Sequence, residues 1–359
     1  MAKVLVAMSG GVDSSVAAAL LKEQGHEICG VTLKLYENED IGVCNMRTCC
    51  SLTDVEDARR VAAKMGFRHV VFSYVDEFRK DVMSRFAAEY ASGRTPNPCI
   101  DCNRFIKFPR LLNRARLLGM EYIATGHYAR IEYDSSINRW LLKKARDISK
   151  DQTYVLYALT QDELAHTFFP LGNLLKTEVR KLAEERGLVN ARKPDSQDIC
   201  FVPDGDYAAF LERSMGVDIP EGNFVDTKGN ILGKHKGHHR YTIGQRKGLG
   251  IGFGEPKYVI AKDPEKNTVV LGSKDELKSA GFIARDVNWI LFDELRQPVA
   301  ATVKTRYHQP EVPAILYPHR DGVEVRYETP QFSAAPGQSA VFYHGDTVVG
   351  GGIVADIIK

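Results

Sequence analysis

Short apolar runs alternate with amphipathic stretches through the first half of the chain. The runs are rich in β-branched residues and predict buried strands over residues 3–8, 28–35, 69–73 and 122–125. The amphipathic stretches repeat apolar residues at helical spacing and predict helices over residues 14–24, 54–65, 77–91, 105–118 and 177–186. This alternation favours a doubly wound parallel α/β sheet, in which ligands bind outside the carboxyl ends of the strands.

The pattern changes near residue 205. A short helical stretch over residues 207–213 precedes segments that are punctuated by glycine. Beyond residue 281, short stretches of alternating polar and apolar residues predict strands, among them 301–307, 323–327 and 339–343. We therefore expect a small central domain and a C-terminal β-barrel-like domain after the sheet, with domains over residues 1–204, 205–280 and 281–359.

Composition narrows the class of protein. The chain has 359 residues and a formal net charge of +2, so any surface for nucleic acid must be local. No apolar run approaches the ~18 residues of a membrane span, and no signal-peptide pattern precedes the first predicted strand. We expect a cytoplasmic protein that does not enter a membrane and is a monomer when free.

The loop after the first predicted strand carries the clearest chemical signal and reads Ser9-Gly10-Gly11-Val12-Asp13-Ser14-Ser15. Its glycines let the backbone approach an anion, and its serines then face that anion at a helix N-terminus, where phosphate is favoured. No lysine follows the glycines, so this is not a Walker A loop. It resembles the PP-loop of enzymes that split ATP into AMP and pyrophosphate. The alternative is a strand–turn–helix that binds nothing.

Cys102 is a candidate nucleophile. The helical pattern begins just after it, near Asn103, and Arg104 is close in sequence. A helix N-terminus and a neighbouring cation both stabilise a thiolate, so we expect the pKa of Cys102 to be lowered. Cys200 follows a polar loop that is poorly suited to a core, and it is a candidate second redox thiol.

The remaining cysteines leave alternatives open. The chain has seven cysteines, and an odd number without a secretion signal favours thiol chemistry or metal binding over a disulfide scaffold. Cys29 lies in an apolar run and is expected in the core. Cys44, Cys49 and Cys50 lie in an insert-like loop that could hold Zn²⁺ through thiolates or hold nothing.

The densest basic stretch covers residues 234–247. Its cations suit RNA phosphates, and Tyr241 or one of its histidines could stack on a base. A solvated basic turn is the alternative interpretation.

Seven motifs in order resemble the bacterial tRNA-specific 2-thiouridylases nearly from end to end. They are SGGVDSS at 9–15, GRTPNPCIDCNRFIKF at 93–108, ATGHYAR at 124–130, KDQTYVLY at 150–157, KPDSQDICF at 193–201, GKHKGHHRYTIGQRKGLGI at 233–251 and APGQSAVFY at 335–343. The resemblance implies an ATP-dependent sulfurtransferase that thiolates the wobble uridine of tRNAs with Lys, Glu or Gln anticodons.

The resemblance also implies which residues bind the substrates. ATP with Mg²⁺ would bind Ala7, Met8, Ser9, Gly10, Gly11, Val12, Asp13, Ser14, Leu33 and Gly126, with Asp13 near the phosphates or the metal and the adenosine site lined by main chain at Leu33 and Gly126. The tRNA would contact Asn97, Pro98, Cys99, His127, Lys150, Asp151, Gln152, Arg306, Tyr307 and Gln338.

In the implied mechanism the enzyme adenylates the C2 oxygen of uridine and then replaces it with sulfur. A sulfur-relay protein or a cysteine desulfurase delivers the sulfur as a persulfide on Cys200. Cys102 then attacks Cys200, or frees hydrogen sulfide, and closes a transient disulfide that a reductant reopens. Cys102, Cys200 and Asp13 are the implied catalytic residues.

One departure from the family pattern opens an alternative mechanism. Many relatives have Asn-Pro-Asp where this chain has Asn97-Pro98-Cys99, so a carboxylate is missing there. The change creates three candidate thiolate ligands, Cys99, Cys102 and Cys200, which could hold a [4Fe–4S] cluster with one open iron site.

Two other functions are weaker alternatives. A PP-loop synthetase acting on a small metabolite would have no use for Cys102 and Cys200. A non-catalytic, metal-containing RNA-binding protein would have no use for the PP-loop.

Overall fold

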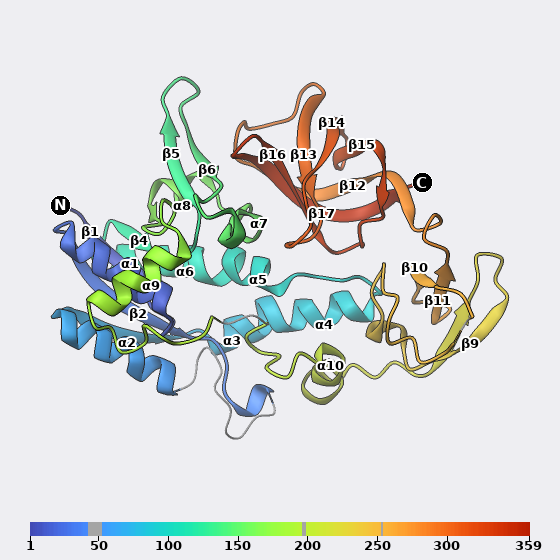
Figure 1. Ribbon diagram of the computed structural model, residues 1–359, viewed down its shortest axis with the longest axis horizontal. Coiled ribbons are helices and arrows are strands. Elements are labelled where there is room, and N and C mark those ends of the chain that lie inside the picture. Colours follow the sequence, from blue (N-terminus) through green and yellow to red (C-terminus); the bar gives the residue numbers. More distant parts are fainter. Residues whose placement is uncertain (42–51, 196–198, 253) are drawn as a thin grey trace. The chain divides into compact units, whose positions relative to one another are not determined.

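The computed structural model describes residues 1–41, 52–195, 199–252 and 254–359 (Figure 1). Within these ranges the chain forms two compact units. The first unit comprises Met1–Met83, Pro98–Asp206 and Asp346–Val348, and the second comprises Ser84–Asn97, Tyr207–Gly345 and Val349–Lys359. In the described ranges, no helix combines the length and the apolar character needed to cross a membrane.

The first unit is built on a parallel sheet with the strand order β3-β2-β1-β4-β7. Its strands are β1 (Lys3–Ala7), β2 (Glu27–Lys34), β3 (Arg68–Ser73), β4 (Tyr122–Ala124) and β7 (Thr167–Phe168). Val4, Leu5 and Val6 of the central strand have no exposed surface. A strand that is covered on both faces reads as a continuous apolar run, which is why the sequence predicts this sheet. The predicted doubly wound parallel sheet is confirmed.

Helices cover both faces of this sheet. On one face α1 (Val12–Glu23), α2 (Leu52–Met65) and α9 (Lys176–Glu185) pack over Val4 and Val6. On the other, α6 (Phe108–Leu117) packs against β1 and β4. The three helices of the first face begin within two residues of the predicted positions.

Two predicted helices differ from the observed ones. The prediction over 77–91 corresponds to α3 (Val75–Phe78), the π-helix η2 (Arg79–Met83) and α4 (Ser84–Ala91). The prediction over 105–118 corresponds to a helical run of α5 (Pro98–Asp101), the π-helix η3 (Cys102–Lys107) and α6. This second run begins seven residues early because Pro98 stands at its first position, where the missing N–H of proline costs no helical hydrogen bond.

Several short elements of the first unit were not predicted. They are η1 (Glu39–Ile41), β5 (Arg130–Asp134), β6 (Arg139–Lys143), η4 (Ile148–Lys150), α7 (Thr153–Leu156), α8 (Gln161–Ala165) and the two-residue strand β7. The strand β5 has no buried residue, so it lacks the buried face that an alternating pattern would report.

The second unit contains α4, α10 (Tyr207–Met215), η5 (His238–Arg240) and two sheets. The smaller sheet has the order β10-β11-β8-β9, with β8 (Gly222–Val225), β9 (Ile231–His235), β10 (Tyr258–Asp263) and β11 (Thr268–Gly272). The larger one is a barrel of β12 (Lys278–Trp289), β13 (Val299–Lys304), β14 (Val312–His319), β15 (Gly322–Phe332), β16 (Ser339–His344) and β17 (Thr347–Ile358).

The barrel closes through pairing of β12 with β17. Phe282 and Val325 lie opposite each other in β12 and β15, and both have no exposed surface. The central domain and the C-terminal β-barrel that the sequence predicts are therefore confirmed, whereas the boundaries at residues 204 and 280 stay predictions.

Candidate functional site

The loop between β1 and α1, the predicted anion cradle, lies at the carboxyl edge of the sheet. Gly10 has a φ of 73°, and a Cβ there would lie 2.4 Å from the backbone oxygen of Asp54, so only glycine fits. Gly11 is the N-cap of α1, and no side chain caps this helix end. The first N–H groups of α1 therefore suit an anion. Ser14 steadies the loop, since its Oγ lies 3.2 Å from the N–H nitrogen of Ser9.

The other segments expected to bind ATP reach the same edge. Ala7 of β1 pairs with Val31 of β2, which places Leu33 just beyond the start of the loop. Gly126 follows β4, and a Cβ there would lie 2.6 Å from the nitrogen of Ser14. The main chain at Gly126 therefore lies directly against the first turn of α1. Binding of ATP by these residues stays a prediction, but the structure does bring them together.

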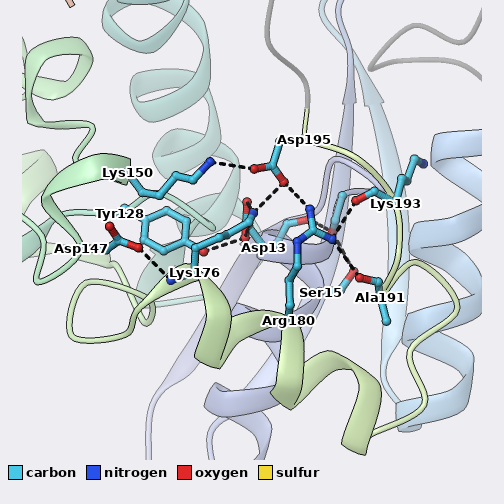
Figure 2. Close-up of polar contacts among 12 residues, drawn as sticks. Asp13, Ser15, Tyr128, Asp147, Lys150, Lys176, Arg180, Ala191, Lys193 and Asp195 are labelled. Atoms are coloured by element: carbon cyan, nitrogen blue, oxygen red, sulfur yellow. Dashed lines mark hydrogen bonds and ion pairs between the residues drawn. The ribbon is translucent and has the colours of Figure 1, made fainter. Parts of the chain in front are cut away.

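A network of charged side chains surrounds Asp13, and Figure 2 shows its members pointing toward one another. We call it the Asp13 cluster and define it as Asp13, Tyr128, Lys150, Lys176, Arg180 and Asp195. Lys176 Nζ lies 2.7 Å from both carboxylate oxygens of Asp13 and 2.8 Å from Asp195 Oδ1. Tyr128 Oη donates to Asp13 Oδ1 at 2.8 Å.

Asp195 accepts bonds from three cations of the cluster. Lys150 Nζ lies 3.0 Å from its Oδ2, and Arg180 lies 2.8 Å from the same Oδ1 atom that Lys176 contacts. Burial opposes ionisation of Asp195, but the hydrogen bonds from Lys176 and Lys150 outweigh it and lower its pKa. Burial and the charge of Asp13 raise the pKa of Tyr128, so its phenol remains a donor.

Two further side chains hold the loop from the segment before Asp195. Asn190 Nδ2 donates to the carbonyl of Gly10 at 2.9 Å and to Ser15 Oγ at 2.8 Å. Lys193 Nζ lies 3.2 Å from the same Gly10 carbonyl and pairs with Asp57 at 2.8 Å. These contacts fix the backbone whose N–H groups form the cradle.

Sequence reasoning missed most of this network. Tyr128, Lys193 and Asp195 lie inside motifs that the sequence singles out, but no role was expected for them. The one signal for Lys176 and Arg180 is their spacing, since they lie one helical turn apart at the start of α9.

The environment of Cys102 differs from the one that the sequence predicts. It is the fifth residue of the helical run that starts at Pro98, so it does not stand at a helix N-terminus. Its side chain is buried, and this burial raises the pKa of the Cys102 thiol to about 11 despite the opposing charge of Lys107. The expected lowering of its pKa is therefore wrong in this conformation.

The backbone at Cys200 is anchored close to the helices that carry Cys102. Tyr36 Oη donates to the Cys200 carbonyl at 2.9 Å, and Phe201 packs edge-on against Phe78 with ring centroids 5.6 Å apart. Phe78 ends α3, which packs against the π-helix that contains Cys102. Among the described residues, no disulfide joins either thiol to another cysteine.

The metal sites that were considered find no support in the described part of the chain. There, no three His, Cys, Asp or Glu side chains converge as metal ligands. Cys99, Cys102 and Cys200 therefore do not form a ready [4Fe–4S] site in this conformation. The cysteines at 44, 49 and 50 lie outside the described residues, as do residues 196–198 of the KPDSQDICF motif.

The residues of the first unit that were expected to contact tRNA make internal bonds. His127 Nδ1 lies 2.6 Å from Thr125 Oγ1, and burial lowers the pKa of His127 to about 3, so the ring is neutral. Asp151 Oδ1 accepts from the Ala145 N–H at 2.9 Å. Gln152 Oε1 accepts from the Tyr128 N–H at 2.8 Å, which ties the 150–152 segment to the Asp13 cluster.

The second unit holds the other residues expected to contact tRNA. Gln338 Nε2 donates to the carbonyl of Thr95 at 2.9 Å, which places it beside the segment that ends in Asn97. Arg306 donates to the carbonyl of Ile243 at 2.7 Å. Their contact with tRNA, like that of Tyr307, stays a prediction.

The basic stretch over 234–247 has a buried side and an exposed side. His238, His239 and Tyr241 are buried, and Tyr241 packs against Phe224 with ring centroids 5.1 Å apart. The suggested stacking of these rings on an RNA base is therefore wrong, because they form part of the interior of the unit. The exposed cations of the stretch are Lys234, Lys236, Arg246 and Lys247, which we call the basic turn.

Comparison with known proteins assigns almost the whole chain to one protein family. Family models match it in three parts: the tRNA methyl transferase HUP domain over residues 2–204, the tRNA methyl transferase PRC-barrel domain over 208–273 and the aminomethyltransferase beta-barrel domain over 279–354. The tRNA-specific 2-thiouridylase MnmA of Acetivibrio thermocellus is 53% identical over 354 residues, which are 98% of this chain and 99% of that protein. The MnmA of Halothermothrix orenii is 51% identical over 358 residues, which are 99% of each chain. The chain therefore belongs to the family of tRNA-specific 2-thiouridylases, which are tRNA sulfurtransferases.

Proposed function

We propose that the chain catalyses the ATP-dependent 2-thiolation of the wobble uridine of tRNA. The observation that carries this proposal is that one compact unit contains the PP-loop with its uncapped helix N-terminus and two thiol segments that each contact α3. Membership of the family supports tRNA as the substrate, because the relatives are tRNA-specific.

Activation of the base is the first step. The C2 oxygen of uridine attacks the α-phosphorus of ATP, and pyrophosphate leaves. The uncapped N–H groups of α1 suit the phosphates, and Asp13 would hold the Mg²⁺ that ATP carries. The C2 oxygen of uridine is a poor leaving group by itself. Once adenylated, it leaves readily as part of AMP.

Sulfur transfer is the second step. A persulfide on Cys200 attacks C2 through its terminal sulfur, and AMP leaves. The Cys102 thiolate then attacks Cys200 Sγ, which releases the thiocarbonyl of the product and leaves a Cys102–Cys200 disulfide. An external dithiol reduces this disulfide by thiol exchange. The contact of each thiol segment with the same short helix, α3, supports this partnership.

Metal-free enzyme tests this mechanism. Chelator-treated protein is mixed with unmodified tRNA, Mg-ATP and a cysteine desulfurase, and nucleoside mass spectrometry measures 2-thiouridine. We expect product with the wild type and none with Cys200→Ser. Cys99→Ala should still form 2-thiouridine at saturating tRNA, because the persulfide route does not use the Cys99 thiol, although its predicted tRNA contact is lost. Product that appears only after anaerobic iron–sulfur reconstitution, and is lost in Cys99→Ala, would replace this route with the cluster mechanism. No product under either condition contradicts the thiolase function.

Affinity for tRNA should fall steeply with salt. The basic turn presents four exposed cations, and neutralising about four phosphates predicts a loss of roughly 50-fold in affinity between about 50 and 200 mM salt. Filter binding across this range measures the slope. Replacing Lys234 and Lys236 together by alanine should lower the slope by about half, because two of the four cations are removed. An unchanged slope would show that the basic turn does not contact the tRNA.

A further inference from the structure

The scheme above gives Lys176 no role, although it lies at the centre of the Asp13 cluster. Lys176 is the first residue of α9, and its side chain is only 11% exposed. Its ammonium makes three short contacts with two carboxylates, at 2.7, 2.7 and 2.8 Å. One carboxylate belongs to the PP-loop and the other lies five residues before Cys200.

The position of the Lys176 ammonium connects the cluster to the PP-loop. It contacts Asp13, the second residue of α1, and among the described residues no side chain caps the start of that helix. A largely buried cation is costly unless it is paired, and Asp13 and Asp195 supply the pairing for Lys176. The ammonium therefore lies beside a helix N-terminus that suits a multiply charged anion.

The main chain of Lys176 is held independently of its ammonium. Its N–H donates to Asp147 Oδ2 at 2.9 Å, and Glu178 closes the first turn of α9 by accepting from the N–H of Leu175 at 2.7 Å. The helix therefore starts at this point whatever the side chain of residue 176 is. A purely structural role would not need its ammonium at the PP-loop.

We propose that Lys176 is a catalytic residue of the adenylation step, and that Asp195 is its positioning residue. This inference rests on the proposed function. The step forms the bond between uridine O2 and the α-phosphorus, breaks the bond from that phosphorus to pyrophosphate, and releases the N3 proton of the base to water. Negative charge grows on the departing pyrophosphate oxygen. The ammonium of Lys176 donates a hydrogen bond to the reacting phosphates and offsets this charge.

The test measures adenylation without sulfur chemistry. Pyrophosphate release from Mg-ATP is followed with unmodified tRNA and no sulfur donor, so that neither cysteine contributes to the readout. Lys176→Met keeps the alkyl stem and removes the charge. We expect kcat for pyrophosphate release to fall about 10²- to 10³-fold, the usual effect of removing one charge-stabilising donor, with the KM for ATP changed less than about fivefold. Lys176→Arg should restore part of kcat.

Two further variants separate catalysis from folding. Lys181 lies on the same helix with its side chain 77% exposed, so Lys181→Met is the matched control and should behave as wild type. Asp195→Asn should lower kcat by about tenfold while leaving the KM for ATP nearly unchanged, because it frees the ammonium without removing it. A thermal melt shows whether Lys176→Met folds. If it does not, Lys176→Arg and Asp195→Asn provide the same test, because both should lower kcat while leaving the KM for ATP nearly unchanged.

The outcomes distinguish the inference from the proposed function. Wild-type enzyme that releases no pyrophosphate with tRNA contradicts both. Active wild type with a Lys176→Met kcat within threefold of it contradicts only the role of Lys176. A Lys176→Met variant that loses thermal stability but keeps the wild-type kcat per folded molecule would show that the side chain is only a structural pin, and would also overturn the inference.

Discussion

Replacing Gly126 by alanine is expected to lower kcat/KM for ATP by about tenfold or more, measured as tRNA-dependent pyrophosphate release. A Cβ at this position would lie 2.6 Å from the nitrogen of Ser14 and 2.7 Å from the carbonyl carbon of Asp13. These atoms are backbone, so no flexible side chain can move away. Overpacking of this kind costs about 1–3 kcal/mol, and each 1.4 kcal/mol corresponds to a factor of about ten.

The damage should be local to the nucleotide site, because the atoms displaced are those of the first turn of α1. Gly252→Ala is the matched control, since no atom of the residues that the structure describes lies within 4 Å of a Cβ placed there. This control should keep wild-type kinetics. Wild-type kinetics in Gly126→Ala would instead show that the chain after β4 separates from the PP-loop without cost, and that position 126 does not line the ATP site.

Cys102 is expected to react with iodoacetamide about a hundredfold more slowly at pH 8 than a thiol of ordinary pKa. Burial raises its pKa from 9.0 to about 11. The thiolate is the reactive form, so at pH 8 its fraction falls from about one in ten to about one in a thousand. Because a rising pH removes the proton, the rate should increase about tenfold per pH unit and level off only near pH 11.

Peptide mass spectrometry of tRNA-free enzyme measures this rate. Cys99 lies three residues earlier on the same helical run and is exposed, so its labelling in the same sample is the internal reference. A Cys102 rate that levels off below pH 9 would mean that the thiolate is stabilised after all, as the sequence alone suggested. A slow Cys102 would mean that its attack on Cys200 needs a rearrangement that exposes the Cys102 thiol.

The parallel sheet could be predicted from the sequence because the apolar runs that indicate its strands consist of neighbouring residues. The central strand is buried on both faces, so Val4, Leu5 and Val6 stand next to one another in the sequence as an apolar run. The start of the helix at Pro98 was not predictable from periodicity. Proline ends most helices but is well tolerated at a first position, and only the surrounding packing decides which applies.

The candidate site was predictable only where a motif is continuous. The PP-loop is a single stretch of sequence, whereas Lys176 meets Asp13 across 163 residues. The charge of the basic stretch could be counted from the sequence, but its burial could not. His238 and His239 look like cations in the sequence and prove to be interior side chains of their unit.

The anchoring of the segment at Cys200 has a practical consequence. Tyr36 contacts the main-chain carbonyl of Cys200, and the packing comes from the ring of Phe201 against Phe78. Neither contact uses the thiol, so the backbone at position 200 should tolerate an exchanged side chain. Selenocysteine or a photocaged cysteine introduced there would keep this backbone in place, and a flash of light could then start sulfur delivery at a chosen moment for time-resolved measurements.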